Sequence, residues 1–279
     1  QRVKLREGIR WGALRSILSV TDETGELGGR PPYDPLVMFR VVLLGQWHDL
    51  SDEELEHVLR VRLDFQLFCD FALSDEAPDK NTIGLFRRKP ESKGVIGPCL
   101  KAVNRELERL GLKVQSGRMV IDSTIIKSAA RPRNIVEVSD GGEPPTSSSS
   151  ADPDAAWTVK GKSFHYGYKE HAVVELEQGY IEDVTVTPAD VHDGTMFKYA
   201  IEGRRNVKEV LADKAYDPSK NRKLLKPRKI KDGVLRRARH TGLAMVTAQP
   251  LLKAICFNLL KASKPMYVLP RAGPAWCYA

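Results

Sequence analysis

Two short apolar runs, each ending in an aspartate, constrain the fold of this chain more than any other feature. The run 119–121 precedes Asp122, and the run 210–212 precedes Asp213. Short runs rich in β-branched residues are typical of buried strands. Each carboxylate is therefore expected at the end of a strand.

Paired carboxylates at strand ends are typical of metal-dependent phosphodiester chemistry. Such chemistry uses two hard cations about 4 Å apart, and Mg²⁺ takes oxygen ligands rather than Cys or His. Asp122 and Asp213 are therefore candidate catalytic residues and candidate ligands of Mg²⁺ or Mn²⁺. A third carboxylate usually completes the site, yet no Glu follows Glu209, and the only later acids are Asp213, Asp217 and Asp232.

The first part of the chain is predicted to be helical. Asp34 before Pro35 is a strong helix start, because Asp accepts a bond from a free N–H and Pro has none to lose. Ser51 with Glu54 predicts a capping box for a second helix. Further helices are expected at 81–88 and 96–110. Such helices suit either a helix-turn-helix DNA-binding module or a plain packing unit, and both interpretations are open.

After residue 117 the pattern changes to strands, which are expected at 118–123, 164–174, 180–187 and 207–212. The middle two flank a Glu-Gln-Gly turn and predict an antiparallel hairpin. A helix over 194–203 leads to a last strand parallel to the first, so that Asp122 meets Asp213. The predicted fold class is α/β, an RNase H-like mixed sheet flanked by helices, with an N-terminal all-helical domain.

These patterns also predict domain boundaries. The helical domain is expected to span residues 1–115 and the RNase H-like domain residues 116–264. Residues 128–160 contain Gly, Pro and Ser runs that cannot bury a core, and they predict a disordered insertion. A helical run over 243–262 is expected to pack on the sheet. Residues 265–279 contain prolines without periodicity and predict an irregular tail.

The net charge of +8 is concentrated in one segment. Residues 214–239 hold eleven Lys or Arg against two Asp. A charged run is either a solvated face or a phosphate-binding track, and its place directly after Asp213 favours the track. The candidate DNA-binding residues are Lys214, Arg222, Lys223, Arg228, Lys229, Arg236, Arg237 and Arg239.

The remaining composition points to the cytoplasm. No run of eighteen apolar residues is present, so no membrane partner is expected. The chain begins at Gln1 without a signal peptide, and we expect that it starts inside a longer reading frame. Its four cysteines lie far apart without metal-binding spacing, which predicts reduced thiols.

Eight segments, in chain order, resemble the motifs of one family. They are residues 29–35, 50–56 and 78–83, the strand that carries Asp122, residues 152–157, Tyr166-Gly167-Tyr168-Lys169, residues 187–193 and Ala212-Asp213-Lys214-Ala215-Tyr216. Together they cover residues 29 to 262 and resemble the DDE-type transposases of bacterial insertion sequences, in the superfamily often called IS-four/IS-five. Any one of these segments is weak evidence for the resemblance, but the ordered set is strong evidence for it.

The resemblance implies an enzyme that cuts and joins double-stranded DNA at the terminal inverted repeats of its element, acting as a homo-oligomer with Mg²⁺. Asp122 and Asp213 match the first two acids of the family. Taken without the resemblance, Asp122 equally suits a cap of a following helix through Ser123-Thr124. Asp213 likewise suits a surface acid paired with Lys214.

Polar residues near these acids have more than one interpretation. Lys214 and Tyr216 either contact DNA phosphate or pack beside the site. His171 is interpreted as a packing residue within a strand, and Asp193 as the best spare carboxylate. Trp157 either stacks on an unpaired base or enters the core.

The third acid is where the chain departs from the family. The family carries it on a helix with the spacing Tyr-x-x-Arg-x-x-x-Glu, but here 236–239 runs almost directly into Gly242, so that interval looks deleted. Asp232, beside Gly233, resembles a turn residue. We interpret the chain as a fragmentary transposase impaired in catalysis. The alternative is a non-enzymatic DNA-binding or subunit-pairing remnant that inhibits full-length transposase; a different RNase H-like nuclease is disfavoured.

Overall fold

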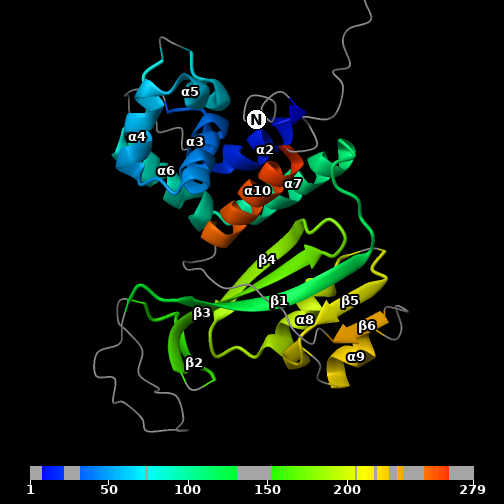
Figure 1. Ribbon diagram of the computed structural model, residues 1–279. Helices are drawn as coiled ribbons and strands as arrows, with labels where there is room; N and C mark the ends of the chain where they lie inside the picture. Colours follow the sequence, from blue (N-terminus) through cyan, green and yellow to red (C-terminus); the bar gives the residue numbers. More distant parts are fainter. Residues whose placement is uncertain are drawn as a thin grey trace, which may run out of the picture. The chain divides into compact units, whose positions relative to one another are not determined.

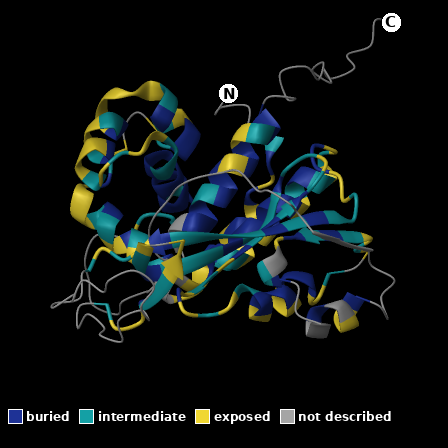
Figure 2. Ribbon diagram, turned by 60° about the horizontal axis from the view of Figure 1, so that its bottom comes forward, coloured by how far each residue is buried: buried dark blue, intermediate teal, exposed yellow. Residues whose placement is uncertain are grey.

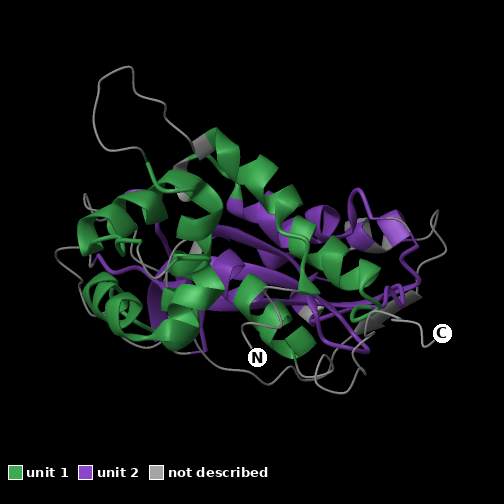
Figure 3. Cartoon of the chain, turned by 90° about the horizontal axis from the view of Figure 1, so that it is seen from above, with its two compact units in different colours: residues 1–95, 102–113, 255–279 green, residues 96–101, 114–254 purple. Residues whose placement is uncertain are grey.

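The structure is a computed structural model of the 279-residue chain. It describes residues 8–21, 32–72, 75–130, 152–161, 163–204, 206–216, 219–225, 231–234 and 248–263. Contacts divide the chain into two compact units, which Figure 3 shows in two colours. Unit 1 comprises residues 1–95, 102–113 and 255–279, and unit 2 comprises residues 96–101 and 114–254.

Unit 1 is helical wherever the structure describes it. Its elements are α2 (Gly12–Leu18), η1 (Ser19–Thr21), α3 (Pro35–His48), α4 (Asp52–Val61), α5 (Leu63–Cys69), α6 (Lys80–Ser92) and the later parts of α7 (Ile96–Arg109) and α10 (Ala248–Ser263). The predicted helix starts are confirmed. Asp34 Oδ1 accepts from the Leu36 N–H at 2.8 Å ahead of α3, and Ser51 and Glu54 form the capping box of α4.

The core of unit 1 gathers around α3, whose residues are buried over most of the helix. This burial includes Arg40, whose guanidinium lies 3.5 Å from Asp70 Oδ2 and 4.7 Å from the centre of the Trp11 ring. The other helices have distinct buried and exposed faces (Figure 2), as in α4, where Leu55 and Leu59 are buried one turn apart. Their packing follows the ordinary amphipathic pattern.

Helix α10 does not follow the prediction that it packs on the sheet as a whole. Only its residues up to Ala254 belong to unit 2, and its remainder belongs to unit 1. There Cys256 Sγ lies 3.6 Å from the Leu43 carbonyl oxygen, and Asn258 Nδ2 donates to Asn104 Oδ1 at 2.7 Å. These buried polar contacts tie the end of the described chain to α3 and α7.

Unit 2 contains a six-stranded mixed sheet (Figure 1). Its strands are β1 (Arg118–Lys127), β2 (Ala156–Lys160), β3 (Ser163–Glu175), β4 (Ile181–Pro188), β5 (Glu209–Ala212) and β6 (Lys231–Val234). The order is β2-β3-β1-β5-β6, with β4 paired to β3. β3 is antiparallel to β1, β2 and β4, whereas β5 is parallel to β1 and β6 to β5. The predicted hairpin and the predicted parallel pairing of the first strand are both confirmed.

Helix α8 (Asp193–Ile201) packs against β1, which contains Asp122, and β5, which ends directly before Asp213. Its Met196 and Phe197 join a buried cluster with Met119 and Ile121 of β1 and Val210 of β5. The same cluster takes in Tyr216 from η2 (Lys214–Tyr216) and Leu225 from α9 (Ser219–Leu225). The mixed sheet flanked by helices that the sequence predicts is therefore present in unit 2.

Three parts of the sheet differ from the prediction. Strand β1 continues past residue 123 to Lys127, because its second half pairs with β3. Residues 156–160, predicted to belong to a disordered insertion, form β2 and also pair with β3, while 131–151 lie outside the described residues. Asp232, predicted in a turn, lies in β6.

No helix in the described ranges is long and apolar enough to cross a membrane. The thiols of Cys69, Cys99 and Cys256 are buried and free. Burial raises the pKa of the Cys99 thiol to about 12, so this group is neutral at physiological pH. Cys277 and the predicted tail at 265–279 lie outside the described residues.

Candidate functional site

The two predicted acids follow the last paired residues of two neighbouring parallel strands. Ile121 of β1 pairs with Ala212 of β5, and this is the final pair of that ladder. Asp122 directly follows Ile121, and Asp213 directly follows Ala212. Both aspartates therefore lie where the pairing of β1 with β5 ends. Asp213 follows the end of β5 as predicted, whereas Asp122 lies inside β1, which rules out its interpretation as the cap of a following helix.

The Asp122 carboxylate lies in a partly buried, negatively charged setting. Burial raises its pKa, as do the charges of Asp213 and Asp193. A hydrogen bond from the Ser123 N–H to Asp122 Oδ1, at 2.8 Å, and the charge of Lys160 act in the opposite direction but do not cancel the rise. A cation at this position would offset both the cost of burying the carboxylate charge and the repulsion from Asp213 and Asp193.

The donor set therefore fits a hard divalent cation. Carboxylate oxygens are the ligands that Mg²⁺ and Mn²⁺ prefer, and Asp122 in β1 and Asp213 directly after β5 would supply them. Within the described ranges, no three His, Cys, Asp or Glu side chains are grouped so that they could hold one metal ion. Two carboxylates thus form the candidate ligand set.

Asp193, the spare carboxylate of the sequence prediction, is already committed to other groups. It is the first residue of α8, and its Oδ2 accepts from Ser123 Oγ at 2.9 Å. Its Oδ1 lies 3.0 Å from Lys169 Nζ, as an ion pair without hydrogen-bond alignment. Lys169 Nζ donates to the Val191 carbonyl oxygen at 2.8 Å. Both oxygens of Asp193 therefore face partners within the protein.

A second buried group lies beside the turn that follows Asp213. Tyr216 is only 2% exposed, and its hydroxyl is 2.9 Å from His171 Nδ1, while His171 Nε2 is 3.0 Å from Thr187 Oγ1. Burial, with the charges of Asp193, Asp122 and Asp213, raises the pKa of the Tyr216 hydroxyl. The packing interpretations of His171 and Tyr216 are confirmed, since both side chains are buried.

The predicted DNA-binding residues are only partly described. The backbone of Lys214 lies in η2 and that of Arg222 in α9, where Lys223 is exposed. Asn221 Nδ2 fixes α9 by donating to the carbonyl oxygens of Gly194 and Tyr216, at 2.8 and 2.9 Å. Arg228, Lys229, Arg236, Arg237 and Arg239 lie outside the described residues.

Trp157 lies in β2 opposite Tyr166 of β3. Its ring centre is 5.3 Å from that of Tyr166, and the side chain is partly buried. The Tyr166 hydroxyl in turn donates to the Asp152 carbonyl oxygen at 2.7 Å. The indole therefore has a packing partner in the sheet, and base stacking stays a prediction.

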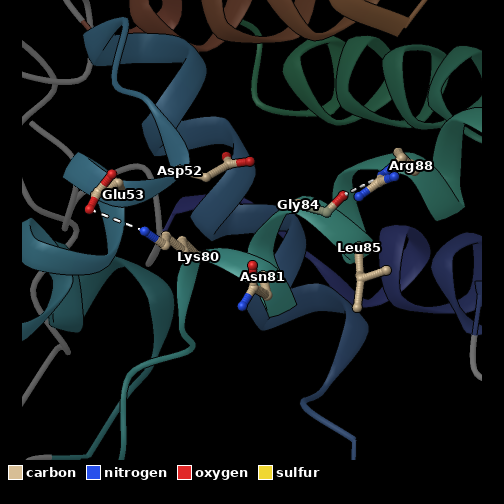
Figure 4. A pocket seen from close by; sticks show the side chains of 7 residues that line it. All are labelled: Asp52, Glu53, Lys80, Asn81, Gly84, Leu85 and Arg88. Carbon is tan, nitrogen blue, oxygen red and sulfur yellow. Dashed lines mark hydrogen bonds and ion pairs between the residues drawn. The ribbon is translucent and has the colours of Figure 1, made fainter.

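Unit 1 has a surface pocket of about 430 Å³ between α4 and α6 (Figure 4). Lys80 Nζ donates to Glu53 Oε1 at 3.2 Å at its edge, and Asp52 pairs with Arg87. Acidic and basic groups are mixed around the pocket, so its charge selects neither an anion nor a cation. The helix-turn-helix interpretation of these helices stays a prediction.

The contacts of Lys169 and Ser123 with Asp193 were not predicted from the sequence. One signal was available: Lys169 and His171 alternate with Val173 along β3, so two polar side chains occupy positions on the core-facing side of a strand. A Lys whose charge is largely removed from water requires a partner. The sequence did not reveal that the partner is Asp193.

Two family models match the chain, a transposase domain (DUF772) over residues 2–89 and a transposase DDE domain over residues 115–244. The transposase for insertion sequence element IS1106 of Neisseria meningitidis serogroup B is 32% identical over 211 residues, covering 60% of this chain and 73% of that protein. A solved structure, the piggyBac transposase synaptic complex with hairpin DNA, is similar over 84% of this chain and 49% of that chain, with a TM-score of 0.35 and 12% identity. This last likeness is too weak to support a conclusion.

Proposed function

Because the chain belongs to the insertion-sequence transposases with a DDE domain, we propose that it descends from an enzyme that cuts and joins DNA at the ends of its element. One observation carries this proposal: the final pair of the β1–β5 ladder, Ile121 with Ala212, is followed on each strand by an aspartate. Such a placement suits the first two acids of an RNase H-like active site.

In this proposal Asp122 and Asp213 hold a divalent cation, Mg²⁺ or Mn²⁺. When bound, the cation supplies Lewis-acid activation of the attacking and leaving oxygens of a phosphodiester. The protein's own contribution is orientation. Ser123 holds one oxygen of Asp122, and η2, which begins directly after Asp213, is fixed by the burial of Tyr216.

The proposed substrate is double-stranded DNA with the terminal inverted repeats of the element. The basic run at 214–239 suits a phosphate track, since its Lys and Arg would displace condensed counterions. The helices of unit 1 would add a DNA-binding module, and the protein would act as a homo-oligomer on the DNA. The exposure of Lys223 on α9 supports the first of these assignments.

We further propose that catalysis is impaired in this chain. No Glu follows Glu209, so the family's third acid has no counterpart in the expected interval before Gly242. Losing a ligand that positions a cation costs several kcal/mol of transition-state stabilisation, or about a thousandfold or more in rate. Asp193 does not replace it while it pairs with Lys169.

This deficit also favours a second function. A chain that keeps the helical unit and the basic run but lacks the third acid would occupy DNA ends, or pair with full-length subunits, without cutting. It would then inhibit a full-length transposase. The two functions differ in one property, which is whether the isolated chain cleaves DNA.

The test is a binding and cleavage assay on DNA that carries the element's terminal repeats. We expect binding without metal and no nicking with Mg²⁺ or Mn²⁺, and Asp122→Asn is expected to change nothing in the cleavage assay because no activity remains to be lost. A scrambled-repeat DNA serves as the control for specific binding. Metal-dependent nicking that Asp122→Asn abolishes would overturn the proposed impairment.

A further inference from the structure

A partly buried ion pair in unit 2 is given no positive role in the function proposed above. The side chains of Lys169 on β3 and Asp193 on α8 are only 14% and 15% exposed, and their charged atoms are 3.0 Å apart. Burying both charges costs desolvation energy that their attraction offsets only when further hydrogen bonds complete the geometry. Lys169 obtains one from the Val191 carbonyl, and Asp193 obtains one from Ser123.

Ser123 connects this pair to the first candidate ligand. Its hydroxyl donates to Asp193 Oδ2 at 2.9 Å, while its backbone N–H donates to Asp122 Oδ1 at 2.8 Å. By strand alternation Ser123 lies on the side of β1 that carries Met119 and Ile121 toward the core. Asp193 thus holds the residue whose N–H sets the orientation of the Asp122 carboxylate.

Strand β3 connects the pair to the second candidate ligand. His171, two residues after Lys169 on β3, has its Nδ1 2.9 Å from the Tyr216 hydroxyl. Tyr216 closes the short turn after β5, in which its N–H donates to the Asp213 carbonyl oxygen at 2.9 Å. Contacts of β3 and α8 therefore reach the chain beside both carboxylates.

We propose that Lys169 and Asp193 are positioning residues for the metal site: the pair fixes Ser123, and through it the Asp122 carboxylate, while Asp193 stays paired with Lys169 and does not bind the cation. This inference rests on the proposed function, since it assumes that Asp122 and Asp213 bind a divalent cation. Residues that orient metal ligands typically change metal affinity by 10- to 100-fold when they are replaced.

A role through charge alone predicts a different outcome. If Lys169 only repelled a nearby cation, replacing it with a neutral residue would strengthen Mn²⁺ binding, because a positive charge is removed. If Asp193 were a ligand, freeing it from Lys169 would also strengthen binding. Positioning predicts that loss of Lys169 weakens binding.

The experiment measures Mn²⁺ affinity of the full chain by electron paramagnetic resonance, without DNA. Wild type and Asp122→Asn are compared first. Wild type is expected to bind, and Asp122→Asn to bind at least tenfold more weakly. Failure of this comparison would refute the metal site of the proposed function, and the positioning proposal with it.

Once that comparison holds, Lys169→Met and Asp193→Asn are each expected to weaken Mn²⁺ binding about tenfold, with the double variant no weaker than either single variant. Lys198→Met is the matched control, since Lys198 is exposed on α8, and it is expected to bind as wild type. Unchanged or stronger binding by folded Lys169→Met would overturn the positioning proposal while leaving the metal site intact.

Ser123 variants keep the proposal testable if Lys169→Met fails to fold. Ser123→Ala removes the hydroxyl without leaving a lone buried charge, and it is expected to weaken Mn²⁺ binding about tenfold. Ser123→Thr keeps the hydroxyl and is expected to restore the wild-type affinity. Equal affinities for Ser123→Ala and wild type would contradict the link from Asp193 to Asp122.

Discussion

The imidazole of His171 lies between two hydroxyl groups, 2.9 Å from that of Tyr216 and 3.0 Å from that of Thr187. The residue is 3% exposed. Burial lowers its pKa from 6.5 to about 4, although the charge of Asp193 acts in the opposite direction. At neutral pH an uncharged imidazole therefore joins β3, β4 and η2.

His171 is expected to make unit 2 less stable in acid. Between pH 6.5 and about 4 the unfolded chain takes up a proton that the folded chain does not, so the free energy of unfolding falls as the pH falls. The slope from this one group is at most about 1.4 kcal/mol per pH unit. Urea unfolding of wild type and His171→Gln across this range measures it, and His171→Gln is expected to show the shallower dependence.

His57→Gln is the matched control for this prediction, because His57 is exposed on α4. It should keep the pH dependence of the wild type. If the free energy of unfolding depended equally on pH in wild type and His171→Gln, protonation of the buried imidazole would not limit stability.

At the residue scale, the sequence predicts groups whose chemistry is local. The places of Asp122 and Asp213 beside the β1–β5 ladder were predictable because each follows its own apolar run. The Asp34 cap was predictable because the N–H groups that donate to it are within three residues. The partners of Ser123 and Lys169 were not, because Asp193 is 70 residues from Ser123 along the chain. Only the folded sheet brings them together.

Whole helices and strands were likewise predictable only where their signals lie close together along the chain. The cap at Ser51 fixed the start of α4, and the turn at 177–179 fixed the β3–β4 hairpin, because both signals are short-range. Strand β2 has only a short alternation, Trp157 and Val159 with Thr158 and Lys160, at the end of a polar segment, and β6 lies in a basic segment without one. They form because β3 and β5 offer unpaired edges, which is a tertiary property that propensity does not record.

The basic run at 214–239 is the element whose role is most directly measurable. If it neutralises phosphates, replacing Arg236, Arg237 and Arg239 with Ala should flatten the salt dependence of DNA binding by roughly three units, about 0.9 per lost contact. The measurement is the slope of log K against log salt concentration by fluorescence anisotropy.

Single substitutions supply a matched pair for the same measurement. Lys223→Ala, exposed on α9 within the run, should lower the slope by about 0.9, whereas Lys198→Ala, exposed on α8 outside it, should not. An unchanged slope in the triple variant would mean that the run is a solvated face.

For the whole molecule, the strongest expectation concerns the interval before Gly242. Inserting a Tyr-x-x-Arg-x-x-x-Glu helical segment between Arg239 and Gly242 should restore metal-dependent nicking of terminal-repeat DNA. The reason is that the segment returns a third carboxylate to a site that already has two. Plasmid nicking with Mn²⁺ is the measurement.

The control for this graft is the same segment with Gln in place of its Glu, which should bind DNA but remain inactive. Asp122→Asn in the grafted chain should also abolish nicking. If the Gln segment were as active as the Glu segment, the third acid would not be the missing component. Asp193 or Asp232 would then be the next carboxylate to replace.

Unit 1 is built from segments near both ends of the chain, so it cannot be completed until synthesis is almost finished. Its residues up to 113 leave the ribosome before the strands of unit 2, but its last segment begins only at residue 255. Until then Asn104 lacks the Asn258 amide that it contacts in the finished protein. A nascent chain therefore holds an incomplete helical core throughout the synthesis of the sheet, when exposed helix faces are open to other chains. Translation that stops before residue 255 yields a complete sheet unit attached to a helical unit that cannot close.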